Sequence, residues 1–236
     1  MQQAQAKWKV DMHSHTRLSK DSLNDPRQLV EAAAKHGLQA LCVTDHNGLA
    51  NALALSRLPD LPIVVVPSEE VKSKEGEIIG YFLGELVPKG LSPEETAQRI
   101  RDQGGIVGVP HPFDRARSGS RLQTPALERL VAAGLVDVLE VFNARATFAE
   151  DNLRALEFAR QHGLPMSAGS DAHTLVEVGR AYVEVPPFSN AEEFLAGLRQ
   201  SEVQGKLSSG LIHVSSKWAT FMKAVGLARK SSAPFS

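Results

Sequence analysis

Short apolar runs recur along this sequence, and nearly every run ends in a histidine or a carboxylate. These polar endings lie at residues 11–15, 45–46, 69–70, 111 and 171–173. Histidine and carboxylate side chains are the common protein ligands of divalent metals. Because the endings are spread over the whole chain, they predict a fold that brings distant segments to one site. A multinuclear metal hydrolase is therefore the first functional hypothesis.

The apolar runs alternate with segments of amphipathic helical pattern. Strands are expected at 8–12, 40–44, 63–66, 78–86, 106–109, 136–142, 165–168 and 182–185, and helices at 26–36, 92–103, 125–133, 148–162 and 191–200. This alternation is typical of parallel βαβ units, and about seven of them in one domain favour a closed barrel. Functional side chains of such barrels lie at the C-terminal ends of the strands. The sequence predicts an α/β barrel with its metal site there.

The last part of the chain differs in character from the rest. We expect residues 1–207 to form the barrel domain and residues 208–236 to form a C-terminal extension. Within the extension, residues 218–228 have the pattern of a short amphipathic helix, and a flexible tail is expected from residue 229.

Composition narrows the function classes. The formal net charge is −1 and the sequence pI is about 6.7, so no basic face for a long polyanion is expected, and nucleic acid is expected only as a short substrate. The single cysteine, Cys42, lies in an apolar run and predicts a buried side chain rather than a disulfide. No apolar run is long enough to cross a membrane, which favours a cytoplasmic enzyme. The oligomeric state stays open.

The candidate ligands differ in how strongly their local pattern supports them. His13 and His15 are two residues apart at a strand end, so both side chains point to the same face. His46 follows a buried strand, although the Asn-Gly pair after it also suits a turn. Glu69 and Glu70 are adjacent and cannot both point inward, and the local pattern alone does not choose between them.

Further candidates follow later strands. His111 lies between two prolines that fix its backbone, and Asp171 and His173 repeat the two-residue spacing, where a buried acid needs a cation or hydrogen bonds. Asp21 on its own has the pattern of a loop acid or helix cap. Three histidines lack a comparable setting: His36 and His162 precede glycines at helix ends and are expected to be structural, and His213 is undecided.

Taken in order, these motifs resemble those of the PHP superfamily, the polymerase and histidinol phosphatase group of phosphoesterases. The resemblance rests on D-x-H-x-H-T-x-x-S-x-D at 11–21, Thr-Asp-His at 44–46, the glutamate after the third strand, His-Pro at 111–112 and Gly-Ser-Asp-Ala-His at 169–173. It implies a distorted (β/α)7 barrel that carries two or three divalent ions, which are zinc, iron, manganese or magnesium in this family. It also implies hydrolysis of phosphoesters.

The resemblance also implies which residue serves each ion. The ligands of the first ion would be His13, His15, Glu70 and Asp171, those of the second Glu70, His111 and Glu77, and those of the third Asp21, His46 and His173. Glu70 is chosen over Glu69 because Pro-Ser-Glu-Glu at 67–70 aligns with the family's Pro-Gly-x-Glu. Many members carry a histidine soon after this glutamate, whereas this chain has Gly-Glu-Ile-Ile at 76–79. Glu77 would replace it, and a carboxylate-rich site favours manganese or magnesium.

The expected reaction is hydrolysis of a small phosphomonoester, such as a sugar, amino-alcohol or nucleotide phosphate, by a water that the ions activate. Arg115, Arg117 and Arg145 follow candidate strand ends, and an arginine fork suits phosphate oxygens. Any one of them has an alternative interpretation as a solvated loop charge, and we prefer Arg117 and Arg145. His46 or His173 is the candidate to protonate the leaving oxygen.

Other functions stay open from the sequence. A phosphodiesterase or exonuclease acting on short oligonucleotides would use the same scaffold, but aromatic residues for stacking are few, at 6%. A non-catalytic module of the same fold is a second alternative, disfavoured because almost every ligand position is filled. An amidohydrolase-like barrel is a third, and a lysine on a middle strand that it would need is not found.

Overall fold

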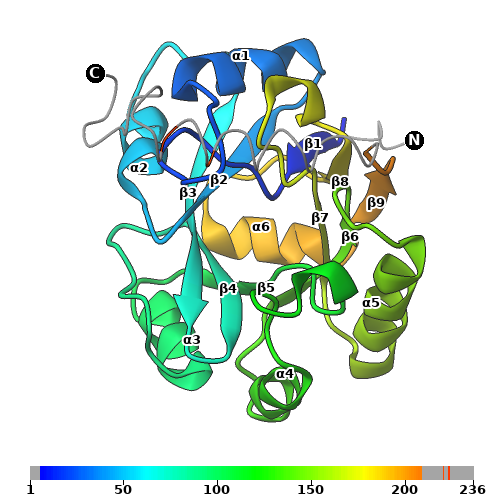
Figure 1. Cartoon of the computed structure of the whole chain (residues 1–236). Coiled ribbons are helices and arrows are strands. Elements are labelled where there is room, and N and C mark those ends of the chain that lie inside the picture. The colour runs from blue at the N-terminus through cyan, green and yellow to red at the C-terminus, as the bar shows by residue number, and fades with distance from the viewer. Residues whose placement is uncertain (1–5, 209–219, 221–222, 224–236) are drawn as a thin grey trace.

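The computed structural model describes residues 6–208, 220 and 223. Helices and strands alternate along the chain (Figure 1), as predicted. The strands are β1 Trp8–Asp11, β2 Ala40–His46, β3 Val64–Ser73, β4 Gly76–Tyr81, β5 Ile106–Val109, β6 Val138–Asn143, β7 Met166–Gly169, β8 Ala181–Val185 and β9 Glu202–Gly205. The α-helices are α1 Pro26–Lys35, α2 Ala50–Ser56, α3 Pro93–Arg101, α4 Thr124–Ala132, α5 Ala149–His162 and α6 Ala191–Leu198. Two 3₁₀ turns span Arg115–Arg117 and Leu175–Glu177.

The strands form one sheet that curls into a nearly closed barrel. Its order is β7-β6-β5-β4-β3-β2-β1-β8-β9. Past the end of β1, the chain turns toward β7: the amide of Met12 donates to the carbonyl of Ala168 at 3.2 Å, and Ser14 pairs with Ala172 in a parallel bridge. Strands β1 to β7 therefore enclose the barrel, and β8 and β9 extend the sheet beside β1. The predicted α/β barrel is confirmed.

The strand directions depart from the expected all-parallel pattern. β3 pairs with β4, and β4 with β5, in antiparallel register, and β8 runs antiparallel to β1. The reason for the first reversal is a tight turn after Ser73, whose hydroxyl donates to the carbonyl of Gly76 at 2.6 Å. Gly76 has φ +137°, a conformation that side chains rarely permit. The hairpin places Lys72 opposite Glu77.

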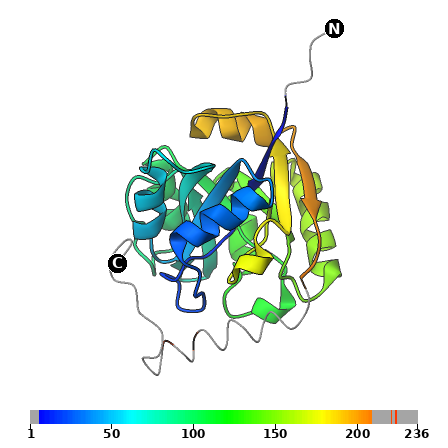
Figure 2. The ribbon, with the colours of Figure 1, turned by 90° about the horizontal axis from the view of Figure 1, so that it is seen from above.

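The core has two parts because side chains alternate across the sheet. On β2, Ala40 and Cys42 face the barrel interior, whereas Leu41 and Val43 face the outer helices. Cys42 is buried and unpaired, as predicted. Helix α6 adds Phe194 to the interior cluster and lies across the end of the barrel opposite the loop between β1 and α1 (Figure 2). The opposite end of the barrel carries the histidines and carboxylates that follow the strands.

Sequence patterning missed α2 and β9 and misjudged the lengths of β3 and β4: the strand expected at 78–86 is wrong beyond Tyr81, where β4 ends. Helix α2 lacks a side-chain N-cap, and β9 has only one half-buried residue, Val203, among exposed positions, so neither has a strong local signal. Pro67 was expected to end the third strand but lies within β3, where its carbonyl accepts a hydrogen bond from the amide of Leu83 at 2.9 Å. The strand therefore continues to Ser73. Glu69 and Glu70 thus lie inside the strand.

Part of the predicted C-terminal extension is outside the description. The expected helix at 218–228 and its tail, together with His213, lie outside the described residues, apart from positions 220 and 223. Within the described part of the chain, the helices are all too short or too polar to span a bilayer.

Candidate metal centre

The candidate ligands come from every barrel strand except β6. They are His13 and His15 just after β1, Asp21 in the loop before α1, His46 at the end of β2, Glu70 in β3, Glu77 in β4, His111 after β5, and Asp171 and His173 after β7. Eight of these nine side chains, all except Asp21, supply ligand atoms to four overlapping groups in which the atoms lie within 4.8 Å of one another. The structure therefore brings together the side chains that the sequence singled out, from positions up to 160 residues apart (13 to 173).

Four of these side chains form the innermost group. His13 Nε2 lies 3.5 Å from Glu70 Oε2 and 3.7 Å from Asp171 Oδ1. His15 Nε2 lies 3.6 Å and 3.2 Å from the same two oxygens. Atoms that share one ion at about 2.1 Å are separated by roughly 3 to 3.5 Å. The group has the spacing that a single divalent ion requires.

Glu70 also faces the second group. Its Oε1 lies 3.1 Å from His111 Nε2, which is 3.8 Å from Glu77 Oε2. Glu77 comes from β4, which is antiparallel to β3, so the unexpected hairpin is what places this carboxylate beside Glu70. The resemblance implied Glu77 as the substitute for a histidine that this chain lacks, and Glu77 lies within reach of this group.

The third group lies nearest the solvent. Asp21 Oδ2 is 3.3 Å from His173 Nε2 and 3.6 Å from His46 Nε2. The ring centroids of His15 and His173 are 4.3 Å apart, so this group adjoins the first. Asp21, which the local pattern alone favoured as a loop acid, is thereby placed among the candidate ligands.

Several buried atoms of the cluster have no hydrogen-bond partner within the described residues. They are His13 Nε2, His15 Nε2, Asp21 Oδ1, Glu70 Oε2, His111 Nδ1 and Asp171 Oδ1. A buried polar atom without a partner is costly and rare. Four of these six, on His13, His15, Glu70 and Asp171, are the nitrogens and oxygens that face one another in the innermost group. A set of lone pairs directed at one another is what bound cations would satisfy, so the residues suit a multinuclear metal site.

Strand β6 contributes a residue that the sequence analysis missed. Glu140 is almost fully buried, and its Oε1 lies 3.1 Å from His13 Nδ1. Its Oε2 accepts from the amide of His111 at 2.7 Å and from Asn143 Nδ2 at 3.0 Å. A carboxylate behind a histidine fixes the ring so that its other nitrogen faces a metal. The available signal was an acid within the apolar run Val-Leu-Glu-Val-Phe.

Two more rings are oriented from behind. His15 Nδ1 lies 3.1 Å from Ser19 Oγ, and because that hydroxyl donates to Asp45 Oδ1 at 2.6 Å, the ring nitrogen is the donor in this pair. His173 Nδ1 donates to the carbonyl of Asp171 at 2.8 Å. In both rings Nε2 is left as the lone pair that faces the cluster.

Charge and burial act against each other at these groups. Burial opposes ionisation of Asp171, but the guanidinium of Arg117 and the ring of His13 outweigh it and hold its pKa well below the ordinary value. Burial, aided by the charges of His173 and His46, lowers the pKa of His15 to about 3. His15 is thereby held as the neutral imidazole that metal binding needs. At His13 and His46 the neighbouring carboxylates overcome the effect of burial and raise the pKa well above the ordinary value, so a metal bound there would displace a proton.

Backbone conformation adds to the geometry at two strand ends. His111 has φ 30° and Asp171 has φ 53°, values that are uncommon for residues other than glycine. Such conformations persist where the surroundings hold them: the amide of Asp171 donates to the carbonyl of His13 at 2.7 Å, and that of His111 is held by Glu140. Both side chains are thereby directed into the cluster.

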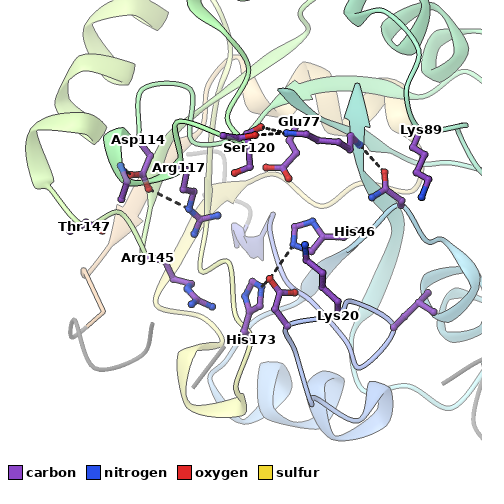
Figure 3. A pocket seen from close by; sticks show the side chains of 16 residues that line it. Lys20, His46, Glu77, Lys89, Asp114, Arg117, Ser120, Arg145, Thr147 and His173 are labelled. Carbon is purple, nitrogen blue, oxygen red and sulfur yellow. Dashed lines mark hydrogen bonds and ion pairs between the residues drawn. The ribbon is translucent and has the colours of Figure 1, made fainter. Parts of the chain in front are cut away.

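A cavity of about 860 Å³ opens over the cluster. Asp21, His46, Glu77 and His173 line it, together with Arg117 and Arg145 (Figure 3). The two arginines approach from one side and the histidines lie at the centre of the view. This is a volume ordinary for small-molecule sites.

The three predicted arginines differ in placement. Arg117 forms an ion pair with Asp171 and lies 3.3 Å from Asp114 through its Nε. Arg145 is 4% exposed, and its Nε lies 3.6 Å from Glu177 Oε1. Arg115 is not among the cavity-lining residues. Its Nε donates to Asp151 at 2.7 Å, and its guanidinium stacks on the ring of Phe148. The short 3₁₀ turn that contains Arg115 directs its side chain toward α5.

Glu69 and two histidines lie outside the described metal-type groups. Glu69 accepts from the amide of Val87 at 3.0 Å, because adjacent strand residues face opposite sides of the sheet, and burial raises its pKa to about 7. His36 is the C-cap of α1. His162 ends α5 and packs 4.3 Å from the ring of Phe158.

Comparison with known proteins agrees with this geometry. The family model of the PHP domain matches residues 11–76, and the PHP-associated model matches residues 149–203. An uncharacterised protein of Methanocaldococcus jannaschii is 39% identical over 196 residues, which are 79% of this chain and 77% of that protein. A protein of Caldicellulosiruptor bescii named a probable phosphatase is 24% identical over 205 residues, which are 74% of this chain and 83% of that protein.

A solved structure shares the fold. It is a two-domain protein of Bacteroides vulgatus, described as containing a predicted PHP-like metal-dependent phosphoesterase, with a TM-score of 0.70 and 18% identity. The match covers 86% of this chain and 66% of that one, so this chain spans just under two thirds of that protein. The ordered strand-end residues, the nearly closed barrel and the two family matches lead to one conclusion: the chain belongs to the PHP superfamily.

Proposed function

We propose that the protein is a metal-dependent phosphoesterase that hydrolyses a small phosphomonoester. One observation carries the proposal: facing, unpartnered nitrogens and oxygens of buried histidines and carboxylates adjoin a cavity with two arginines on its wall. The family membership supports the reaction class. The substrate class rests on the cavity.

Each group has a task that follows from its position. Two or three divalent ions would supply charge that activates a water and neutralises phosphate oxygens. Around them, His13, His15, Glu70 and Asp171 would hold the first ion and Glu70 would be shared with the second, held with His111 and Glu77. The third would be held by Asp21, His46 and His173. The number of carboxylates favours manganese or magnesium over zinc or iron.

Substrate binding and proton transfer are assigned to the cavity wall. Arg117 and Arg145 line the cavity and would bind the phosphate oxygens that do not face the ions. His46 has a side chain that is 18% exposed, against 4% for His173. With two ions bound and the third absent, His46 carries no metal and, as the more exposed ring, is the better candidate to deliver a proton to the leaving oxygen.

The test is phosphate release after metal removal and restoration. The protein is stripped with EDTA, supplied with manganese, zinc or magnesium, and assayed on sugar, amino-alcohol and nucleotide monoesters and on a dinucleotide. We expect hydrolysis of a monoester that disappears in EDTA and returns with metal, and His13→Ala should lose it while keeping its circular dichroism. Hydrolysis that is undiminished in EDTA would overturn the metal mechanism, and a preference for the dinucleotide would overturn the monoester assignment.

A further inference from the structure

The loop between β1 and α1 closes around an ammonium group from the far end of the chain. Lys223 is only 6% exposed. Its Nζ donates to the carbonyl oxygens of Arg17 at 2.8 Å and Ser22 at 2.6 Å, and to that of Ser19. Three backbone carbonyls thus converge on one cation, although the sequence separation exceeds 200 residues.

The chemistry of this cage is specific. An ammonium has three N–H donors and no acceptor, and burying it is costly unless all three are bonded. Three carbonyls satisfy all three donors from a single nitrogen. A ring of carbonyl oxygens is also the arrangement with which proteins replace the hydration shell of a monovalent cation. A planar guanidinium, whose donors are spread over three nitrogens, does not match it.

The caged loop is the same loop that serves the metal centre. In the sequence, Asp21 lies between Ser19 and Ser22, whose carbonyls bind the ammonium. Its Oδ2 is 3.3 Å from His173 Nε2. The hydroxyl of Ser22 lies 3.0 Å from the carbonyl of His15 and 3.2 Å from that of His173. Ser19 orients the ring of His15 from 3.1 Å. A shift of this loop would therefore move groups of the first and third clusters together.

We propose that Lys223 is a positioning residue: a tethered cation that holds residues 17–22 around its ammonium and so keeps Asp21 and His15 in place for metal binding. The inference rests on the metal role that the proposed function gives these residues, but not on the phosphoester substrate. It has a direct consequence. Without the lysine side chain, the three carbonyls form a site that a free monovalent cation, such as ammonium or potassium, can occupy.

The experiment uses the full chain with Lys223→Ala, which removes the charge and leaves the place of the ammonium open to a free cation. Lys35→Ala, at an exposed position on α1, is the matched control. Manganese affinity is measured by calorimetry, and amide hydrogen exchange is followed over residues 16–24. Both are measured in choline chloride and again after addition of ammonium or potassium chloride.

We expect Lys223→Ala to lose about tenfold or more in affinity for its weakest manganese ion, as is usual when a group that orients ligands is removed. Exchange over 16–24 should accelerate, and ammonium or potassium should restore both. The unchanged protein and Lys35→Ala should respond to neither salt. If Lys223→Ala does not fold, Lys223→Arg tests the positioning by manganese affinity and exchange alone, since it keeps the charge without the compact shape of the ammonium.

Two outcomes would overturn the proposal. The first is wild-type manganese affinity and wild-type exchange in Lys223→Ala, or in Lys223→Arg where that variant replaces it. The second is a loss in Lys223→Ala that no monovalent cation restores although its circular dichroism is native. Neither readout needs turnover, so failure of every monoester in the hydrolysis assay would contradict the proposed function and leave this result standing.

Discussion

Two adjacent glutamates show how one strand separates a candidate ligand from a core acid. Glu70 faces four histidines, at 3.5 Å from His13 Nε2 and 2.9 Å from His46 Nδ1, while Glu69 faces the amide of Val87 on the other side of β3. Since side chains alternate along a strand, the pair offers a matched comparison of similar chemistry in two environments.

We expect Glu70→Gln to lose metal and activity and Glu69→Gln to keep both. Loss of a group that merely orients ligands costs about 10- to 100-fold, so loss of the shared carboxylate should reduce hydrolysis by roughly 100-fold or more. Metal content measured by elemental analysis and phosphate release check both variants. Equal metal content in the two variants would remove Glu70 from the ligand set.

Glu140 permits a second test at a residue that the sequence analysis did not identify. Glutamine at this position still accepts from the amide of His111 but no longer holds His13 with a charge. We therefore expect Glu140→Gln to lower manganese affinity about 10- to 100-fold without loss of the fold, as calorimetry and circular dichroism would show. Unchanged affinity would mean that His13 needs no partner behind it.

The residues that sequence reasoning recovered share one property. His13, His46 and Asp171 are polar side chains at the end of an apolar strand or within two residues of it, so their position in the sequence alone identifies them. Glu140 lies inside β6, where an acid has no such signal. The choice among neighbouring arginines also depends on tertiary direction: Arg115 and Arg117 are two residues apart, yet only Arg117 lines the cavity.

At the scale of elements, the closure of the barrel depends on how closely β7 approaches β1. A Cβ added at Gly169 would lie 2.2 Å from the Cβ of His13 and 2.9 Å from Glu140 Oε1. Those contacts are far below what atoms tolerate, and the first partner lies close to the backbone, so the strands would have to separate. A side chain at this glycine therefore opposes both the closure and the placement of His13.

Gly169→Ala should lower stability by about 1 to 3 kcal/mol, the usual cost of overpacking, and should reduce metal affinity at the same time. Gly84→Ala is the control, because a Cβ there meets nothing within 4 Å. Urea denaturation and manganese titration measure the two effects. A stable Gly169→Ala protein with native metal affinity would show that the strands can part without moving His13.

The sequence predicted most elements but not their directions. The strands at 106–109 and 166–169 and the helix at 26–35 follow from apolar runs, prolines and caps close to their observed ends. The reversal of β4 depends instead on pairing across a turn that ends at Gly76, with φ +137°. Apolar periodicity specifies which residues are buried and is the same for parallel and antiparallel neighbours, so the pattern left the direction open.

At the scale of the whole molecule, one mouth of the barrel concentrates charge from nearly the full length of the chain. Glu70 and Asp171 are fully buried, and charges around them, from His46 and His13 at Glu70 and from Arg117 and His13 at Asp171, hold their pKa values well below the ordinary range despite burial. The metal-free protein therefore retains ionised carboxylates with partial compensation by internal cations. It should fold, but the unpartnered buried atoms of the cluster should lower its free energy of unfolding.

Metal removal should therefore lower the melting temperature without abolishing the fold. Ligand present at 100 times its dissociation constant stabilises the folded state by about 2.7 kcal/mol per site, and about 1 kcal/mol corresponds to roughly 2 to 4 °C for a chain of this size. We expect EDTA to lower the melting temperature by about 5 to 10 °C for each ion removed, and added manganese to restore it. Glu70→Gln should show a clearly smaller shift, because the carboxylate shared by two groups is lost. Calorimetric melting with and without EDTA measures this, and an equal shift in both proteins would place the stabilising ion away from Glu70.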